Sequence, residues 1–171
     1  RLEFIGIPSN KKLLKKFASV CDVITLENEF IDYHLLEYLE SLGKKVFPSS
    51  YTISLIQDKL IQKQTLRKKN IPLPKFIEVN HKKDFQSIVN TLKLPFVLKS
   101  RKMGYDGYGN ALVKNKKDFE TAFISLTHRH SKLLAEEFVD FKMELAVIAA
   151  RTNNDIIEYP VVETIQKNHI C

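Results

Sequence analysis

Apolar residues recur at helical spacing in two stretches of the first fifty positions, and a short β-rich run follows each stretch. The first pattern, in KKLLKKFASV, leads into DVITL, and the second, in IDYHLLEYLESL, leads into KVF before Pro48. Gly43 stands where the C-terminus of the second helix is usually capped. The order helix, strand, helix, strand is typical of a parallel α/β layer, which we expect over residues 1–53. This layer starts without the first strand that it normally has, which indicates that further sequence precedes it.

Residues 54–69 follow a different pattern, because SLIQDKLIQKQTLRKK is rich in helix formers and contains neither glycine nor proline. This composition predicts one long helix. The prolines of NIPLP then stop the helix and mark a domain boundary. We therefore expect residues 54–74 to form a helix that links two domains.

A strand, a helix and a second strand then form a unit that occurs twice. The first copy reads KFIEV, KKDFQSIVNTL and PFVLKS, and the second reads NALVK, KKDFETAFISL and KLLAEEFV. This repeat predicts a small α+β domain over residues 75–139, with its helices on one face of a sheet. The runs ELAVIAAR and IIEYPVVET, joined by TNND, predict an antiparallel hairpin that begins another, truncated layer over residues 140–171.

Composition narrows the class of partner. The 27 basic residues exceed the 20 acidic ones and give a formal charge of +7, which favours nucleic acid or small phosphorylated metabolites. The lysine pairs are scattered and no basic block carries interleaved aromatic residues, so nucleic acid is the weaker alternative. The two cysteines, Cys21 and Cys171, are too few for a disulfide framework or a cysteine-based zinc site. The lack of a long apolar run or a signal-peptide core favours a cytoplasmic location and argues against a membrane partner.

Residues 104–110, GYDGYGN, place three glycines between the apolar runs FVLK and ALVK. The sequence lacks a GxxxxGK[ST] phosphate loop, and its glycines precede a strand, whereas those of a dinucleotide fingerprint precede a helix. Two interpretations stay open. One is a plain hairpin with a tight turn at Asp106-Gly107, and the other is a glycine flap whose backbone N–H groups approach phosphates at close range.

Residues on either side of this loop help to decide between the hairpin and the phosphate flap. Lys99 ends the apolar run FVLK, and a lysine at the end of a buried strand is costly unless an anion meets it. The alternative is that its ammonium group reaches water. Downstream, Glu136 to Val139 would offer backbone groups and an apolar wall to a nucleobase, and Glu144 would accept hydrogen bonds from ribose hydroxyls. An acidic pair at a strand end is more often simply exposed.

The strings VLKSRKMGYDGYGN, EEFVDFKMELAVIAAR and EYPVVET resemble the 5-(carboxyamino)imidazole ribonucleotide synthases, a family of ATP-grasp enzymes. CDVITLENEFID, VFPSS and QDKLIQKQTLRKKNIPLPKF fall in the order and spacing of that family, so the resemblance covers nearly the whole chain. It implies an α/β (α+β) ATP-grasp fold, with the end of a parallel α/β pre-ATP-grasp layer, a small α+β lid domain and the start of a central antiparallel sheet. The family is roughly twice this length, and the sequence matches its middle portion.

The resemblance implies an ATP-dependent ligase of purine biosynthesis. Bicarbonate is phosphorylated by ATP to carboxyphosphate, and the exocyclic amine of 5-aminoimidazole ribonucleotide takes up the carboxyl group. Magnesium is the implied metal, with no ligand for it expected in this stretch, and the full-length protein is expected to form a homodimer.

The same resemblance implies roles for particular residues. Lys59 and Lys99 would contact the phosphates, and Glu144 would hold the ribose. The flap would consist of Gly104, Tyr105, Asp106, Gly107, Tyr108, Gly109 and Asn110. The adenine hinge would consist of Glu136, Glu137, Phe138 and Val139.

Four positions depart from the family pattern. Lys59 and Asn110 stand where the family usually has arginine and glutamine, which keeps hydrogen-bonding character, although lysine lacks the bidentate fork of arginine. Thr164 and Gln166 stand where the family has asparagine and histidine, which weakens the assignment of the acceptor substrate. Two alternatives stay open: another ATP-grasp ligase that joins a carboxylate to an amine, and a non-catalytic nucleotide-binding or RNA-binding module.

Overall fold

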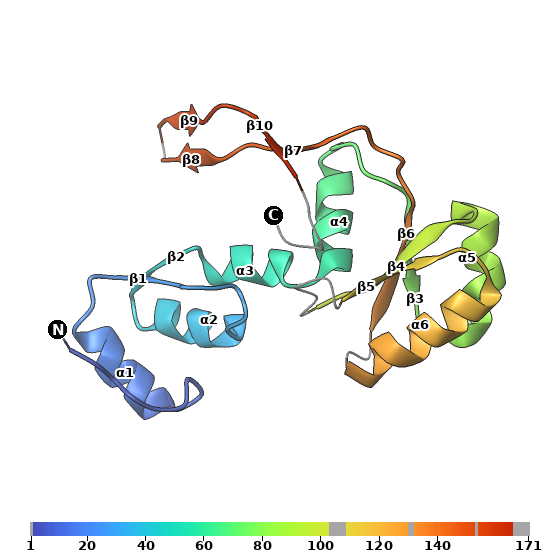
Figure 1. The fold of residues 1–171 in the computed structure, drawn as a ribbon. Helices are drawn as coiled ribbons and strands as arrows, with labels where there is room; N and C mark the ends of the chain where they lie inside the picture. Colours follow the sequence, from blue (N-terminus) through green and yellow to red (C-terminus); the bar gives the residue numbers. More distant parts are fainter. Residues whose placement is uncertain (1, 103–108, 130–131, 153, 166–171) are drawn as a thin grey trace.

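The N-terminal unit combines helices with two parallel strands (Figure 1). The computed structural model describes residues 2–102, 109–129, 132–152 and 154–165. The elements of this unit are, in chain order, α1 (Lys11–Ser19), β1 (Val23–Thr25), α2 (Tyr33–Ser41), β2 (Lys45–Phe47) and α3 (Ser50–Ile56). The parallel pairing of β1 with β2 confirms the predicted α/β layer.

Polar residues start these helices, and apolar residues on their inner faces form a core. The Asn10 side chain accepts the Lys12 backbone N–H at 3.1 Å and caps α1, and Asp32 caps α2 by accepting the His34 N–H at 3.1 Å. Gly43, just after α2, has a φ of +78°, a left-handed conformation that glycine adopts without a steric penalty. The buried core of the unit consists of Ala18, Ile24, Leu36, Leu39, Val46 and Ile53.

The prediction of a single helix over residues 54–69 is wrong. The chain forms α3, which already begins at Ser50, and then a second helix, α4 (Lys59–Lys68). The break lies at Asp58, whose backbone is extended with φ −118° and ψ 110°. The Asp58 carboxylate accepts the Leu60 N–H at 2.9 Å and thereby starts the new helix. Helix-forming composition does not reveal such a break, whereas an aspartate just before an apolar run is a recognisable cap.

The second unit is an antiparallel sheet in the order β3-β6-β4-β5, with helices on one face (Figure 1). Its elements are, in chain order, β3 (Phe76–Val79), the 3₁₀ turn η1 (Lys82–Asp84), α5 (Phe85–Leu92), β4 (Phe96–Ser100), β5 (Asn110–Val113), α6 (Lys116–Arg129) and β6 (Leu133–Glu137). Phe119 of α6 lies at the centre of the core, with its ring centroid 5.3 Å from that of Phe85 and 6.2 Å from that of Phe96. These elements confirm the predicted α+β unit with its helices on one face.

The opposite face of this sheet is turned toward α4 (Figure 1), and Lys63 of α4 contacts Glu136 of β6 on that face. Successive residues of a strand point to opposite faces, so the residues that alternate with the core positions of β4 and β6 face α4. Lys99 on β4 and Glu136 on β6 are two such residues. From α4, the Arg67 guanidinium lies over the ring of Phe76, 4.8 Å from its centroid. The junction between α4 and the sheet therefore contains charged side chains at its centre.

Four short strands form the last part of the described chain. They are β7 (Glu144–Ala146), β8 (Ala149–Arg151), β9 (Ile156–Glu158) and β10 (Val162–Thr164). β7 pairs with β10 and β8 pairs with β9, both antiparallel, which confirms the predicted hairpin. Within the ranges that the structure describes, no helix has the length and apolar character needed to span a bilayer.

Candidate functional site

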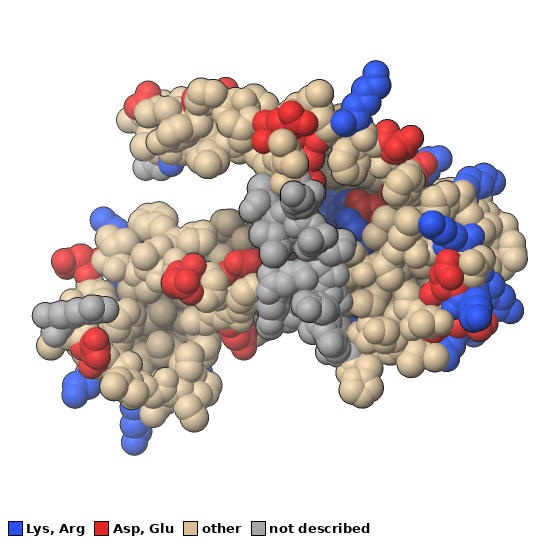
Figure 2. All heavy atoms as spheres, in the orientation of Figure 1, with Lys and Arg blue, Asp and Glu red and all other residues tan. Residues whose placement is uncertain are grey.

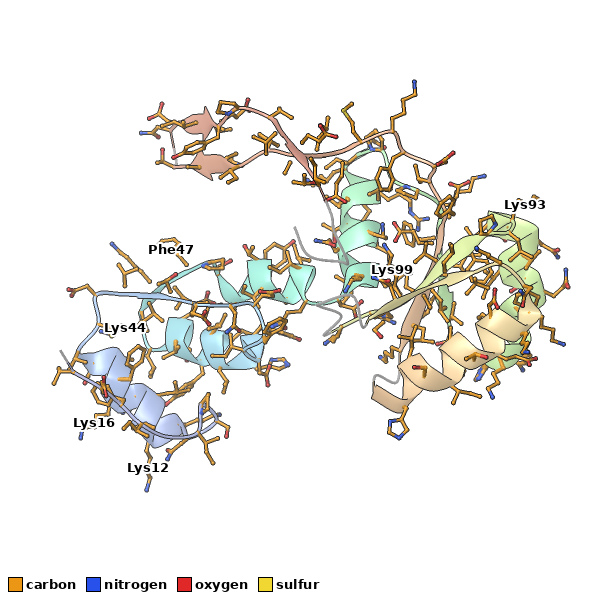
Figure 3. All side chains as sticks on the ribbon, viewed as in Figure 1. Lys12, Lys16, Lys44, Phe47, Lys93 and Lys99 are labelled. Atoms are coloured by element: carbon orange, nitrogen blue, oxygen red, sulfur yellow. The ribbon has the colours of Figure 1, made fainter. Side chains whose placement is uncertain are left out.

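A cluster of lysines around one carboxylate lies between α4 and the sheet. The Lys99 ammonium is 2.6 Å from Oε2 of Glu136, and the Lys63 ammonium of α4 is 2.5 Å from Oε1 of the same carboxylate. The Glu136 and Lys63 side chains are only 9% and 13% exposed, whereas Lys99 remains 30% exposed. Figure 3 shows Lys99 beside α4. The expectation that an acidic pair at a strand end is exposed is therefore wrong for Glu136.

Lys59, the first residue of α4, adds a third ammonium group to this cluster. Burial lowers the pKa of Lys59, and the nearby charge of Lys99 lowers that pKa further, although Asp58 and Glu136 act in the opposite direction. Burial alone would raise the pKa of Glu136, but the hydrogen bonds and charges of Lys63 and Lys99 outweigh burial and lower it. Glu136 is thus an anion that pairs with Lys63 and Lys99, and its charge also acts on the nearby Lys59. The cluster has an excess of positive charge and suits an anionic ligand.

The glycine loop starts directly beside this cluster. β4 and β5 are neighbouring antiparallel strands, and their register places Lys99 opposite Asn110. The Ser100 N–H donates to the carbonyl of Gly109 at 2.7 Å, so the two ends of the loop are tied together. The loop therefore joins adjacent strands, as both interpretations of the sequence require. Gly109 is buried and Asn110 is exposed, while the other five flap positions, 104–108, lie outside the described residues.

The four predicted hinge residues leave the sheet at the end of β6. Glu136 is buried, and Glu137 is the last residue of the strand, with its N–H donating to the carbonyl of Lys75 at 2.9 Å. Phe138 and Val139 follow the strand, and their side chains are 42% and 46% exposed. Both residues are therefore accessible just after β6, the strand that carries Glu136.

Glu144 lies on a different sheet from the lysine cluster. It is on β7, where its Oε1 accepts a hydrogen bond from the Thr164 hydroxyl of β10 at 2.6 Å. Thr164 is one of the positions that depart from the family pattern, and Gln166 lies outside the described residues. The structure thus brings Lys59, Lys99 and Glu136 together, and it holds Glu144 separately in the β7–β10 pair.

Three charged residues at this junction were not predicted from the sequence. Lys63 lies in a polar helix whose pattern does not distinguish it from the other lysines of α4. Asp58 and Arg101 form a buried ion pair between the start of α4 and the end of β4, with the Arg101 NH2 group 2.6 Å from Asp58 Oδ2. The position of Asp58 before a helix was a usable signal, but nothing in the sequence pairs it with a residue 43 positions away.

Basic side chains do not form a continuous patch on the face drawn in Figure 2. They are spread over both units, and basic and acidic atoms lie side by side near the junction of α4 and the sheet. A loop between antiparallel strands, next to a partly buried cluster with excess positive charge, is the arrangement expected of a site for phosphate groups.

Comparison with known proteins agrees with this class of site. The family model of the ATP-grasp domain matches residues 64–171, and the chain belongs to the ATP-grasp family. Within that family it is a homologue of the enzymes of 5-aminoimidazole ribonucleotide carboxylation. It is 41% identical over 172 aligned positions to the phosphoribosylaminoimidazole carboxylase of Candida glabrata, covering 97% of this chain and 30% of that protein. It is 39% identical to the N5-carboxyaminoimidazole ribonucleotide synthase of Synechococcus elongatus, covering 91% of this chain and 39% of that protein.

Solved structures of one further relative carry ligands. The carboxyaminoimidazole ribonucleotide synthase of Aspergillus clavatus in complex with ATP superposes with a TM-score of 0.88 at 37% identity, over 99% of this chain and 44% of that one. The same enzyme with ADP and 5-aminoimidazole ribonucleotide gives a TM-score of 0.85 at 36% identity, over 97% of this chain and 43% of that one. The chain therefore spans less than half the length of these relatives, and the predicted ATP-grasp fold is confirmed.

Proposed function

We propose that the chain is the ATP-binding portion of an enzyme that carboxylates 5-aminoimidazole ribonucleotide in purine biosynthesis. The observation that carries the proposal is the cluster of Lys59, Lys63 and Lys99 around Glu136, at the base of the glycine loop. The relatives support the choice of reaction, because they are named for it and one of them holds ATP in one structure and 5-aminoimidazole ribonucleotide in another.

In this proposal the two phosphate-binding lysines are Lys59 and Lys99. Both are near the start of the flap, and they approach from different elements, α4 and β4. A polyphosphate between them would replace the repulsion of two ammonium groups by attraction to an anion. The backbone N–H groups of residues 104–110 would close over the phosphates from the opposite side, because glycine offers no Cβ to obstruct the approach.

The nucleoside would extend along the end of β6. Glu136, Glu137, Phe138 and Val139 form the proposed hinge for adenine, and the exposed Phe138 and Val139 side chains supply the apolar contact. Glu144 is the proposed partner of the ribose hydroxyls. Its hydrogen bond with Thr164 orients the carboxylate.

The proposed chemistry consists of two steps in which this chain positions ATP. The γ-phosphoryl group passes to bicarbonate and gives carboxyphosphate and ADP, and the amine of 5-aminoimidazole ribonucleotide then attacks the carboxyl carbon and releases phosphate. Phosphoryl transfer depends mainly on positioning and on neutralising charge, which the lysine cluster provides. A flap that excludes water also protects the acyl phosphate from hydrolysis.

Several finer features belong to the same proposal: bicarbonate as the carboxyl donor, magnesium bound with ATP, a homodimer of the full-length protein and a cytoplasmic location. Within the described ranges, no group of three or more His, Cys, Asp or Glu side chains is placed to hold a metal ion. The described residues therefore do not form a metal site from side chains alone, and no step is assigned to the metal.

Calorimetric titration with ATP tests the proposal. Lys99→Ala should weaken ATP binding by about tenfold or more, because a charge-assisted contact to phosphate is lost. Lys12→Ala is the matched control, because it removes the same charge from an exposed position on α1, far from the cluster in Figure 3. Equal ATP affinities in Lys99→Ala, Lys12→Ala and the parent would refute the proposal.

Two further titrations separate the alternatives. Gly107→Val should abolish ATP binding if the flap approaches phosphates closely and should leave it unchanged if the loop is a plain hairpin. Binding to single-stranded RNA that exceeds ATP binding and weakens steeply with salt would instead favour the RNA-binding module.

A further inference from the structure

We propose that Asp58 and Arg101 are positioning residues whose ion pair fixes the distance between Lys59 and Lys99, so that both lysines meet one polyphosphate. The inference rests on the proposed ATP-binding function. It adds a pair of residues that themselves have no access to the ligand, because Asp58 is 3% exposed and Arg101 is 7% exposed.

The contacts of the pair are directional. Arg101 donates from Nε to Asp58 Oδ1 at 2.9 Å and from its NH2 group to Oδ2 at 2.6 Å, which is a bidentate contact. Its remaining NH1 group contacts the Glu78 carboxylate on β3. The guanidinium is therefore held on two sides, by the start of α4 and by the sheet.

The chain positions of the pair connect it to the lysines. Asp58 immediately precedes Lys59, and Arg101 is two residues after Lys99 and three before Gly104, the first residue of the glycine loop. A backbone hydrogen bond runs parallel to the ion pair, because the Lys59 N–H donates to the Arg101 carbonyl at 2.9 Å. The two segments that carry the proposed phosphate-binding lysines are thus joined by three hydrogen bonds.

Such a connection is needed because the lysines repel each other. The 2.9 Å hydrogen bond from the Lys59 N–H to the Arg101 carbonyl places the two lysines on neighbouring segments, and the charge of Lys99 lowers the pKa of Lys59. Glu136 contacts Lys99 and Lys63 directly, and no contact in the described structure ties the Lys59 ammonium to that carboxylate. Without a rigid link between α4 and β4, the free protein would separate Lys59 from Lys99 and would lose the preorganised site.

Asp58→Asn is the sharpest perturbation of this link. Asparagine is as good a helix cap as aspartate, so the hydrogen bonds to the amides of Leu60 and Ile61 can persist while the charge is lost. Asp84→Asn is the matched control. Asp84 also accepts two backbone N–H groups before a helix, from Asn80 at 2.9 Å and His81 at 2.8 Å, but it lies outside the cluster.

The test compares ATP with adenosine in calorimetric titrations of the 171-residue chain. In Asp58→Asn we expect ATP to bind about tenfold more weakly, with adenosine affinity unchanged within about twofold, because only the phosphates need both lysines. A loss that is equal for both ligands would show a purely structural role and would overturn the inference. Unchanged ATP affinity would overturn it as well.

A second variant keeps the inference testable if Asp58→Asn does not fold. Glu78→Gln removes the other anionic partner of Arg101 from a side chain that is 42% exposed, so folding should tolerate it. We expect the same selective loss for ATP, reduced to about threefold, because the bidentate contact with Asp58 remains. ATP affinity equal to that of Asp84→Asn would count against the ion pair.

The outcome also distinguishes this inference from the proposed function. If Lys99→Ala loses ATP binding while Asp58→Asn and Glu78→Gln retain it, the ATP site stands and the positioning role of Asp58 and Arg101 is refuted. If the parent chain and Lys99→Ala bind ATP equally, the proposed function fails and the inference fails with it.

Discussion

Lys63→Met tests how strongly the lysine cluster attaches α4 to the sheet. Removing one partner of a buried ion pair costs about 3–5 kcal/mol when the other partner is left without compensation. Here Lys99 stays 2.6 Å from the second oxygen of Glu136, so the carboxylate keeps one cation. Methionine also retains the apolar part of the lysine stem. We therefore expect the free energy of unfolding to fall by about 2 kcal/mol, the value of a hydrogen bond to a charged group.

Urea unfolding followed by far-UV circular dichroism measures this loss. The sequence contains no tryptophan, which makes helix content the better signal. For a chain of this size, 2 kcal/mol corresponds to a decrease in Tm of about 4–8 °C. Lys68→Met is the control, because Lys68 is an exposed residue of the same helix and its loss should change the stability by less than about 0.5 kcal/mol. If the two variants unfold at the same urea concentration, the contact between Lys63 and Glu136 does not stabilise the fold.

Three other predictions follow from the same geometry. Folding lowers the pKa values of Asp58 and Glu136, so the unfolded chain binds more protons in acid than the folded chain does. The free energy of unfolding should therefore fall as the pH is lowered from about 5 to about 2. The urea midpoint should change less over this pH range in Glu136→Gln than in the parent. Burial and Lys99 lower the pKa of Lys59, and ATP phosphates should raise that pKa again, so calorimetric titration in two buffers at alkaline pH should detect proton uptake on ATP binding that is smaller in Lys59→Met. Phe119→Ala should destabilise the sheet unit by about 3–5 kcal/mol, because Phe119 is fully buried, whereas Phe141→Ala, at a side chain that is 63% exposed, should have little effect in the same unfolding experiment.

Sequence periodicity was sufficient to predict most helices and strands, because their buried faces repeat apolar residues at regular spacing. It failed where a polar side chain decides the structure. Residues 54–69 have a helical composition throughout, yet Asp58 interrupts them, since its carboxylate caps α4 and also pairs with Arg101. Propensity describes each residue alone, and the partner of Asp58 comes from a distant strand.

The candidate site was predictable only in part for a similar reason. Lys99 stood out because a lysine ends an apolar strand, but the sequence did not show that Glu136 would meet it. That contact depends on the pairing of β4 with β6, strands separated by the glycine loop, β5 and α6. Predicting the contact of Lys63 with Glu136 would also have required knowing that α4 packs against the sheet. Short motifs identify residues that can bind phosphate, while the charge balance around them is a property of the assembled fold.

This charge balance connects stability to ligand binding. Lys59 and Lys63 belong to α4 and Lys99 belongs to β4, so the contacts that gather the cations are also the contacts that hold α4 against the sheet. Glu136 offsets only part of the positive charge, and the folded chain keeps a repulsion that a polyphosphate would remove. An anion that binds between α4 and β4 would therefore stabilise the packing of α4 on the sheet. This stabilisation would grow as the concentration of the anion rises above its dissociation constant. The partly compensated cluster is thus a structural connection between α4 and the sheet, and in the proposed function it is also the place where an anion would strengthen that connection.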